Sequence, residues 1–551
     1  MRSRKDGIGD GSELSMEDGN RHSTNSWSDE IILSNRQRRN PETPRFKDRP
    51  NRGNNRERRG DEVPSRDLYA SRVTDRMNDL FRNPKAADFP NKVRQFVEEE
   101  VGNLPKEALS DLLARLGRIL ATDRQMRSEG ASAIKQSMLA LFKRVTRENY
   151  SGSPSELSTC VRALATYAGE IKPTDSNDSG DNVKVANRIL VQWGECLEQQ
   201  SPGIADLCDV ITGMSFSRLN LANGRGFGWD VSLVRELLSE SSKELVAILN
   251  ESKTSLDSED LEKISALSRF MAARSVTSKI LMQEIVSIFW PEDIQASRSC
   301  ELPASTLLGQ KISVLYAATC AGITEKNKVR ELVGAVLLSL DRQPENRISP
   351  ESLGAILVTA KEHGIELTDT DAQKIEEYLE NDLPENWHRM KNYQNGVQQI
   401  IFCLAIARGG EISESVVRLG EQIVDRDSNL SFLENKTSVA LTHLIQNSVV
   451  SEFTSKKSLG PCSLDFLVNV NVNGKNVAVN LEVDGFPYDS TFQIDDKSFN
   501  NTAPFIKGIR DMFVNFKYPV VRMSERELFS DHRVNLNPLS ERLQDAARSK
   551  R

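Results

Sequence analysis

Residues 465–484 read DFLVNVNVNGKNVAVNLEVD, two stretches in which apolar and polar residues alternate on either side of an Asn-Gly pair. An Asn-Gly pair between two alternating stretches is typical of a β-hairpin with a two-residue turn. Such a turn sets the register of the strands, so Phe466 faces Leu481 and Val468 faces Val479. The valines of both strands then share one face with these residues, which predicts a hairpin that packs against a core.

The opposite face of the predicted hairpin carries carboxylates. Asp465 stands opposite Glu482, and Asp484 follows two residues further along the same face. Carboxylates that face each other across two strands destabilise a sheet. We therefore expect a cation, a basic side chain or solvent to compensate for their charge.

The residues after the hairpin complete a small α/β domain. Gly485 ends the second strand, and residues 503–516 (APFIKGIRDMFVNF) have the apolar spacing of a helix. Residues 518–523 (YPVVRM) predict a further strand, and residues 538–547 predict a last helix. The order strand, strand, helix, strand, helix indicates an α/β domain over residues 460–551.

Parts of this domain resemble the RAP domain. The resemblance rests on NLEVDGFPYD at 480–489, on the helix with Lys507 and Arg510, and on KYPVVRMSERELF at 517–529. It covers residues 464–545 and implies a fold akin to the PD-(D/E)XK nucleases. It also implies RNA binding and a role in RNA processing, stability or translation. RAP domains commonly follow degenerate helical repeats, and the organisation of this chain is similar.

The candidates for contact with RNA are basic and aromatic side chains, because these bind phosphates and stack on bases. They are Lys507, Arg510 and Arg522, with Tyr488 as a stacking residue. Tyr488 stands where the RAP family usually has His, and Phe529 replaces a Trp. The first interpretation is an RNA-binding protein in which helical repeats and a RAP-like domain engage RNA.

A metal-dependent endoribonuclease is a second alternative. PD-(D/E)XK nucleases hold Mg²⁺ with carboxylates and stabilise developing charge with a Lys. Asp465 and Glu482 match the carboxylates, Asp484 stands where the Lys is usual and would add a metal ligand, and Lys507 would supply the catalytic cation. Because fold does not imply function, we favour a non-catalytic interpretation and expect no cofactor, Mg²⁺ being required only by a nuclease.

The middle of the chain, residues 86–455, has apolar residues at three- and four-residue steps, which is typical of amphipathic helices. Repeats of 35 to 50 residues built from helix pairs stack into a solenoid, which we expect here; an irregular all-α domain is the alternative. Comparable helices recur every 39 to 54 residues, with centres near Leu113, Val161, Val210, Ile264, Ile312, Ile356, Ile400 and Val439.

The N-terminal segment, residues 1–85, is rich in Arg, Ser and Asn and poor in aromatic residues, which predicts disorder. Residues 36–59 contain ten basic residues against three acidic ones. Such an arm contacts phosphate or carries a nuclear address, or it is a soluble tether. A Ser- and Asn-rich start is also compatible with a bacterial export signal.

Composition bounds the remaining interpretations. The 551 residues carry a net charge of −7, and residues 71–460 carry −9, with 45 basic and 54 acidic residues. An acidic middle favours the alternative of a protein-interaction scaffold. A secreted effector acting in a host cell, either as such a scaffold or as the RNA binder itself, is the related alternative, and the polar N-terminus is compatible with it. No apolar run of about 18 residues is present, so we expect no membrane span. Seven scattered cysteines without a C-x-x-C motif indicate a reducing compartment, either an organelle or a host cell after export.

Overall fold

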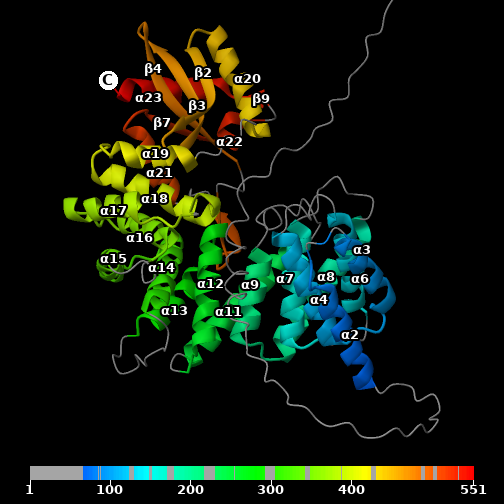
Figure 1. The fold of residues 1–551 in the computed structure, drawn as a ribbon. Coiled ribbons are helices and arrows are strands. Elements are labelled where there is room, and N and C mark those ends of the chain that lie inside the picture. The colour runs from blue at the N-terminus through cyan, green and yellow to red at the C-terminus, as the bar shows by residue number, and fades with distance from the viewer. Residues whose placement is uncertain are drawn as a thin grey trace, which may run out of the picture.

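The protein is mostly helical and ends in a small α/β domain, as the sequence predicts (Figure 1). Tyr488 and the basic stretch 36–59 lie outside the described residues. The computed structural model describes residues 66–84, 86, 88–122, 130–147, 152–169, 179–215, 230–252, 255–291, 304–341, 348–385, 387–423, 430–485, 490–500, 505–530 and 533–550.

An inner row of helices runs through the stack, and each helix of the row contacts the next one. Most centres of the repeat found in the sequence lie on this row and are buried, the exception being Val439 on a later helix. The row consists of α4 (Lys106–Thr122), α7 (Pro154–Gly169), α9 (Ile204–Ser215), α12 (Ser258–Arg274), α14 (Ala304–Cys320), α16 (Pro350–Glu362) and α18 (Lys391–Ala407).

An outer set of helices flanks this row and completes a two-layer stack (Figure 1). Each repeat therefore buries its apolar face against both its own partner helix and the neighbouring repeat. The outer helices are α3 (Phe89–Glu100), α6 (Ala131–Val145), α8 (Ser179–Gln199), α11 (Val231–Ser252), α13 (Lys279–Phe289), α15 (Lys326–Leu340), α17 (Asp369–Asn381) and α19 (Glu414–Ile423), and the short helix η4 (Trp387–Arg389) precedes α18.

The first described helix, α2 (Arg66–Leu80), lies in the segment that the sequence analysis predicted to be disordered up to residue 85. For residues 66–80 that prediction is wrong. Val73 and Met77, four residues apart, are buried, and α2 contacts α3. Packing of one apolar face stabilises this helix although its composition is mostly polar.

Two glycines allow α16 and α18 to approach at backbone contact. A Cβ atom on Gly396 would lie 2.3 Å from the carbonyl oxygen of Pro350, and one on Gly354 would lie 2.6 Å from the carbonyl oxygen of Gly396. A side chain at either position would force the helices apart. Glycine is required here by close packing and not by backbone conformation.

The C-terminal sheet has the strand order β2-β3-β4-β7. β3 and β4 pair antiparallel with Phe466 opposite Leu481 and Val468 opposite Val479, which confirms the predicted register. Asn473 and Gly474 have φ of 52° and 78°, as a two-residue turn of this kind requires. The strands are β2 (Val450–Leu459), β3 (Cys462–Val472), β4 (Lys475–Asp484) and β7 (Val520–Ser524), and α21 (Phe505–Asn515) connects β4 to the parallel β7.

Helices cover both faces of this sheet (Figure 1). α20 (Phe432–Gln446) and α23 (Leu536–Ser549) pack on the face that carries Phe466 and the valines, and α21 covers the opposite face. Short elements α22 (Glu525–Leu528), β8 (Phe529–Ser530) and β9 (Arg533–Val534) connect β7 to α23. The sequence analysis extended the helical region to residue 455, but β2 begins at Val450 and adds an edge strand that it did not predict. β2 is mostly polar and exposed, so its alternation is weak.

A second small sheet joins the α/β domain to the helical stack. β5 (Thr491–Gln493) pairs antiparallel with β6 (Ser498–Asn500) and parallel with β1 (Val276–Thr277), which lies between α12 and α13. The Phe492 N–H donates to the Ser275 carbonyl oxygen at 2.9 Å, and the Ile494 N–H donates to the Thr277 carbonyl oxygen at 2.8 Å. Phe492 is fully buried, and it shares one core with the residues of the helical stack.

The same connection caps helix α13. The carboxylate of Asp495 accepts hydrogen bonds from the Ser278 hydroxyl at 2.6 Å and from the backbone N–H groups of Lys279 at 2.7 Å and Ile280 at 3.3 Å. These N–H groups have no partner inside the helix, so the carboxylate satisfies them and interacts favourably with the helix dipole. The α/β domain therefore completes an element of the stack. Among the described helices, none is both long and apolar enough to cross a membrane.

Candidate functional site

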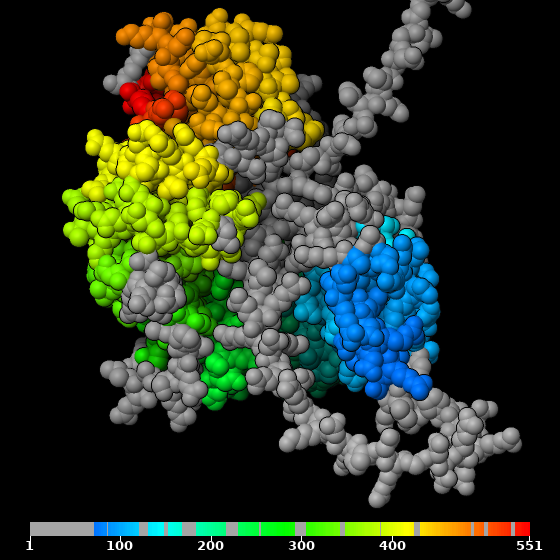
Figure 2. Space-filling view, viewed as in Figure 1, coloured from blue at the N-terminus to red at the C-terminus, as the bar shows by residue number. Residues whose placement is uncertain are grey.

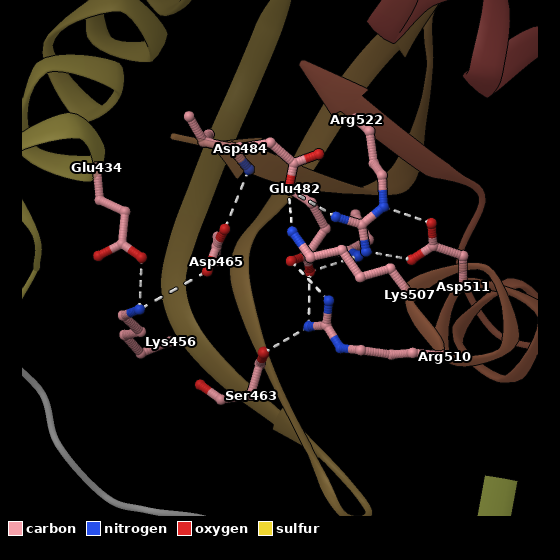
Figure 3. A network of polar contacts seen from close by, with 12 residues as sticks. Glu434, Lys456, Ser463, Asp465, Glu482, Asp484, Lys507, Arg510, Asp511 and Arg522 are labelled. Atoms are coloured by element: carbon pink, nitrogen blue, oxygen red, sulfur yellow. Dashed lines mark hydrogen bonds and ion pairs between the residues drawn. The ribbon is translucent and has the colours of Figure 1, made fainter. Parts of the chain in front are cut away.

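A row of charged side chains crosses the C-terminal sheet on the face covered by α21 (Figure 3). Glu482 on β4 pairs directly with Arg522 on β7. Asp465 on β3 is the next residue of the ladder before Phe466, and Lys456 on β2 lies 3.7 Å from its carboxylate. Asp465 and Glu482, which the sequence predicts to face each other, therefore lie between the cations Lys456 and Arg522.

Helix α21 contributes Arg510, which binds Glu482 with both ends of its guanidinium. Nη1 donates to Oε2 at 2.8 Å and Nη2 donates to Oε1 at 2.9 Å. Nη2 also donates to the Ser463 carbonyl oxygen at 2.8 Å, and the Asn480 amide donates to Oε1 of Glu482 at 2.9 Å. Both oxygens of this buried carboxylate thus accept hydrogen bonds from protein groups.

Ionisation of Glu482 follows from this contact. Burial opposes its negative charge, but the charge and hydrogen bonds of Arg510 outweigh burial and lower the pKa of Glu482. Burial likewise opposes the charge of Arg510, and Glu482 raises the pKa of Arg510 in return. The pair is therefore ionised at neutral pH.

A second pair of cations holds Asp484. Its Oδ1 accepts from Lys507 Nζ at 2.9 Å and from Arg522 Nη1 at 2.9 Å. Arg522 also binds Asp511 through two hydrogen bonds, from Nε at 2.5 Å and from Nη2 at 2.7 Å. These contacts connect β4, α21 and β7 (Figure 3).

Asp465 lies among other carboxylates. Its Oδ2 accepts the Val483 N–H at 3.0 Å, and Lys456, its nearest cation, is bound by Glu434 of α20 at 2.6 Å. Burial and the negative charge of Glu482 raise the pKa of Asp465 to about 7. The surroundings of Asp465 thus raise its pKa into the neutral range.

The structure brings the sequence candidates Asp465, Glu482, Asp484, Lys507, Arg510 and Arg522 into one network, while Tyr488 lies outside the described residues. Sequence reasoning missed Glu434, Lys456 and Asp511. Lys456 and Glu434 belong to elements that precede the predicted domain boundary. Asp511 follows Arg510 directly, and its charge beside a basic helix was the signal that could have identified it.

The metal ligands considered for a nuclease, Asp465, Glu482 and Asp484, do not fit a divalent cation in this arrangement. Mg²⁺ requires free carboxylate oxygens in near-octahedral geometry. Both oxygens of Glu482 are bound by Arg510, and Oδ1 of Asp484 is bound by two cations. In the described part of the chain, no group of three His, Cys, Asp or Glu side chains could hold a metal.

The basic candidates for RNA contact are also engaged within the protein. The side chains of Lys507, Arg510 and Arg522 retain only 20 to 23% of their exposure, and each forms an ion pair with a carboxylate. Their charges are balanced by Glu482, Asp484 and Asp511. Chemically, the network holds α21 and the sheet strands together.

A scan against protein-family models gives no match to this chain. A search of the curated proteins likewise gives no match. The resemblance to RAP domains therefore rests on the motifs within residues 464–545.

Proposed function

We propose that this protein binds RNA without cleaving it. The observation that carries the proposal is the two-bond contact of Arg510 with Glu482 inside a strand-strand-helix-strand unit. Apart from the short strands β5 and β6, β3, β4, α21 and β7 follow the element order that the sequence periodicity predicts for this domain. The carboxylate that a nuclease would need for a metal instead binds the Arg510 guanidinium through both of its oxygens. These features support binding and argue against cleavage.

The helical stack supports the same proposal by providing a long surface joined to the α/β domain. Cys462, Leu464, Ile509 and Val514 of that domain belong to the same apolar core as the stack helices. The Gln398 amide of α18 also donates to the Pro461 carbonyl oxygen at 2.6 Å. A surface that spans both parts would present continuous contacts to an extended strand.

The test uses the full chain and labelled single-stranded RNA in a filter-binding titration. We expect binding that weakens steeply between about 50 and 200 mM salt, because phosphate contacts release counter-ions. The RNA should remain intact with Mg²⁺ or Mn²⁺ present. Absence of binding at the lowest salt would refute the proposal, and cleavage that is lost in Glu482→Ala would refute its non-catalytic part.

A protein-interaction scaffold is the second candidate, and the outer helix α17 favours it. α17 carries Asp369, Asp371, Glu376, Glu377 and Glu380 against a single basic residue, Lys374. Such a surface repels phosphate and attracts basic protein segments. Co-purification of a defined protein by the full chain, with no RNA recovered after crosslinking, would select this candidate.

A further inference from the structure

Helix α20 exposes large apolar side chains on its outward face. Phe432 retains 60% and Val439 retains 56% of their exposure, whereas Ala440, Leu441 and Leu444 on the inward face are buried against the sheet. The helix is thus already anchored through one face. Phe432 and Val439 are seven positions apart, so they lie on one stripe two turns apart.

Cations accompany these apolar side chains. The Lys436 ammonium lies 4.3 Å from the centre of the Phe432 ring and 5.6 Å from the centre of the Phe529 ring. His443 is exposed further along the same stripe. Lys436 is half-buried, and its ammonium is held beside two aromatic rings.

The outward face of α20 contains no carboxylate. The single acidic residue of the helix is Glu434, which is buried and bound to Lys456. The stripe of Phe432, Lys436, Val439 and His443 is therefore apolar and basic. This differs from the site on the other face of the sheet, where every candidate cation has an acidic partner.

In Figure 1, α20 lies on the side of the α/β domain that looks toward the N-terminal helices. Figure 2 shows the surface of the domain on this side. The described strand β8 borders this face of α20, because the Phe529 ring lies against Lys436.

We propose that the outward face of α20 is a contact surface for single-stranded RNA, an inference that rests on the proposed function. A base stacks on the exposed Phe432 ring, and a backbone phosphate pairs with Lys436. Aromatic rings with adjacent cations bind single strands in this way because every base has a π-face and every linkage has a charge. The lack of carboxylates on this face removes the repulsion that an acidic surface would impose.

The experiment compares Phe432→Ala and Lys436→Gln with the wild-type full chain, using labelled single-stranded RNA. Matched controls are Met512→Ala, an exposed apolar residue on α21, and Lys475→Gln, an exposed lysine at the hairpin turn. Phe432→Ala should weaken binding about 5-fold or more, as loss of one stacked base does. Lys436→Gln should lower the slope of log affinity against log salt by about one phosphate contact. Circular dichroism melts establish that the variants are folded.

The outcomes separate the two proposals. RNA binding by the wild type that neither α20 variant weakens beyond its control would overturn the α20 surface and leave the proposed function intact. No RNA binding by the wild type would overturn the function itself. Unchanged RNA affinity with loss of a defined protein partner in Phe432→Ala would assign the surface to protein docking instead.

Discussion

Arg510 binds both carboxylate oxygens of Glu482, at 2.8 and 2.9 Å, and so connects α21 to the centre of the C-terminal sheet. Glu482 is buried, which makes this contact the main compensation for a charge that water cannot reach. The protein itself supplies the counter-ion of Glu482, and the pair holds α21 to β4.

Removal of Arg510 should therefore destabilise the protein strongly. We expect Arg510→Met to lower the free energy of unfolding by about 3–5 kcal/mol, because it leaves a buried carboxylate without a partner. Urea denaturation measures the change. Adding Glu482→Gln to Arg510→Met should restore part of the loss, since it removes the uncompensated charge.

The control for this prediction is Arg418→Met. Arg418 pairs with Glu414 on the surface of α19, and both side chains are more than two-thirds exposed. Its loss should cost less than about 1 kcal/mol. If Arg418→Met and Arg510→Met lowered the free energy of unfolding equally, the Arg510 contact would stabilise the protein no more than a surface ion pair does.

The raised pKa of Asp465 predicts that the stability of the protein depends on pH. The pKa of Asp465 is raised to about 7 in the folded chain, above its value of roughly 4 in an unfolded chain. The folded state therefore binds this proton more tightly, and the corresponding stability is complete below about pH 4 and lost as pH rises through 7. Asp465→Asn should remove this component, because an amide oxygen can still accept the Val483 N–H.

The measurement is the free energy of unfolding of wild type and Asp465→Asn between pH 5 and 8. The free energy of unfolding of Asp465→Asn, relative to that of the wild type, should increase as pH increases. Comparing the two proteins cancels the contributions of carboxyls that do not interact with Asp465. Parallel stability curves over this range would contradict the assignment.

The connection through β5 predicts that the α/β domain and the stack unfold together. Phe492 is fully buried in the shared core and pairs with β1. Phe492→Ala should cost about 3–5 kcal/mol, as the loss of a buried aromatic ring does. Asp495→Ala should cost about 0.5–2 kcal/mol through the lost cap of α13.

Circular dichroism and tryptophan fluorescence provide the test. Residues 430–551 contain no tryptophan, whereas Trp193, Trp290 and Trp387 lie in the stack, so tryptophan fluorescence follows the stack and receives no direct signal from the α/β domain. Phe492→Ala in the α/β domain should shift both transitions equally. A fluorescence transition that stays at the wild-type position would indicate that the two parts unfold independently.

Glycines of two helices should respond oppositely to alanine. Gly396→Ala should destabilise the chain by more than about 1 kcal/mol, since its Cβ would lie 2.3 Å from a carbonyl oxygen of α16. Gly334→Ala on α15 has no atom within 4 Å of the new Cβ and should stabilise by about 0.5–1 kcal/mol. Thermal melts of the two variants, with opposite shifts expected, provide the check.

Sequence reasoning reached the elements that depend on near neighbours. The Asn473-Gly474 turn set the hairpin register, because the turn type alone determines which residues face each other. The spacing of buried residues such as Val161 and Ile356 located the inner row of helices. Helix α2 was missed because its composition suggested disorder, although Val73 and Met77 are buried and the helix packs against α3.

What the sequence determined by itself is periodic or local: the helical stack, the hairpin and the placing of carboxylates on one of its faces. The tertiary structure alone decided which cation each carboxylate binds, and that β5 pairs with a strand more than 200 residues earlier. Such contacts depend on how whole helices and strands pack, and no short-range pattern encodes the distance between residues that meet only after folding. For this reason the sequence identified the charged candidate residues but could not show that their charges neutralise one another.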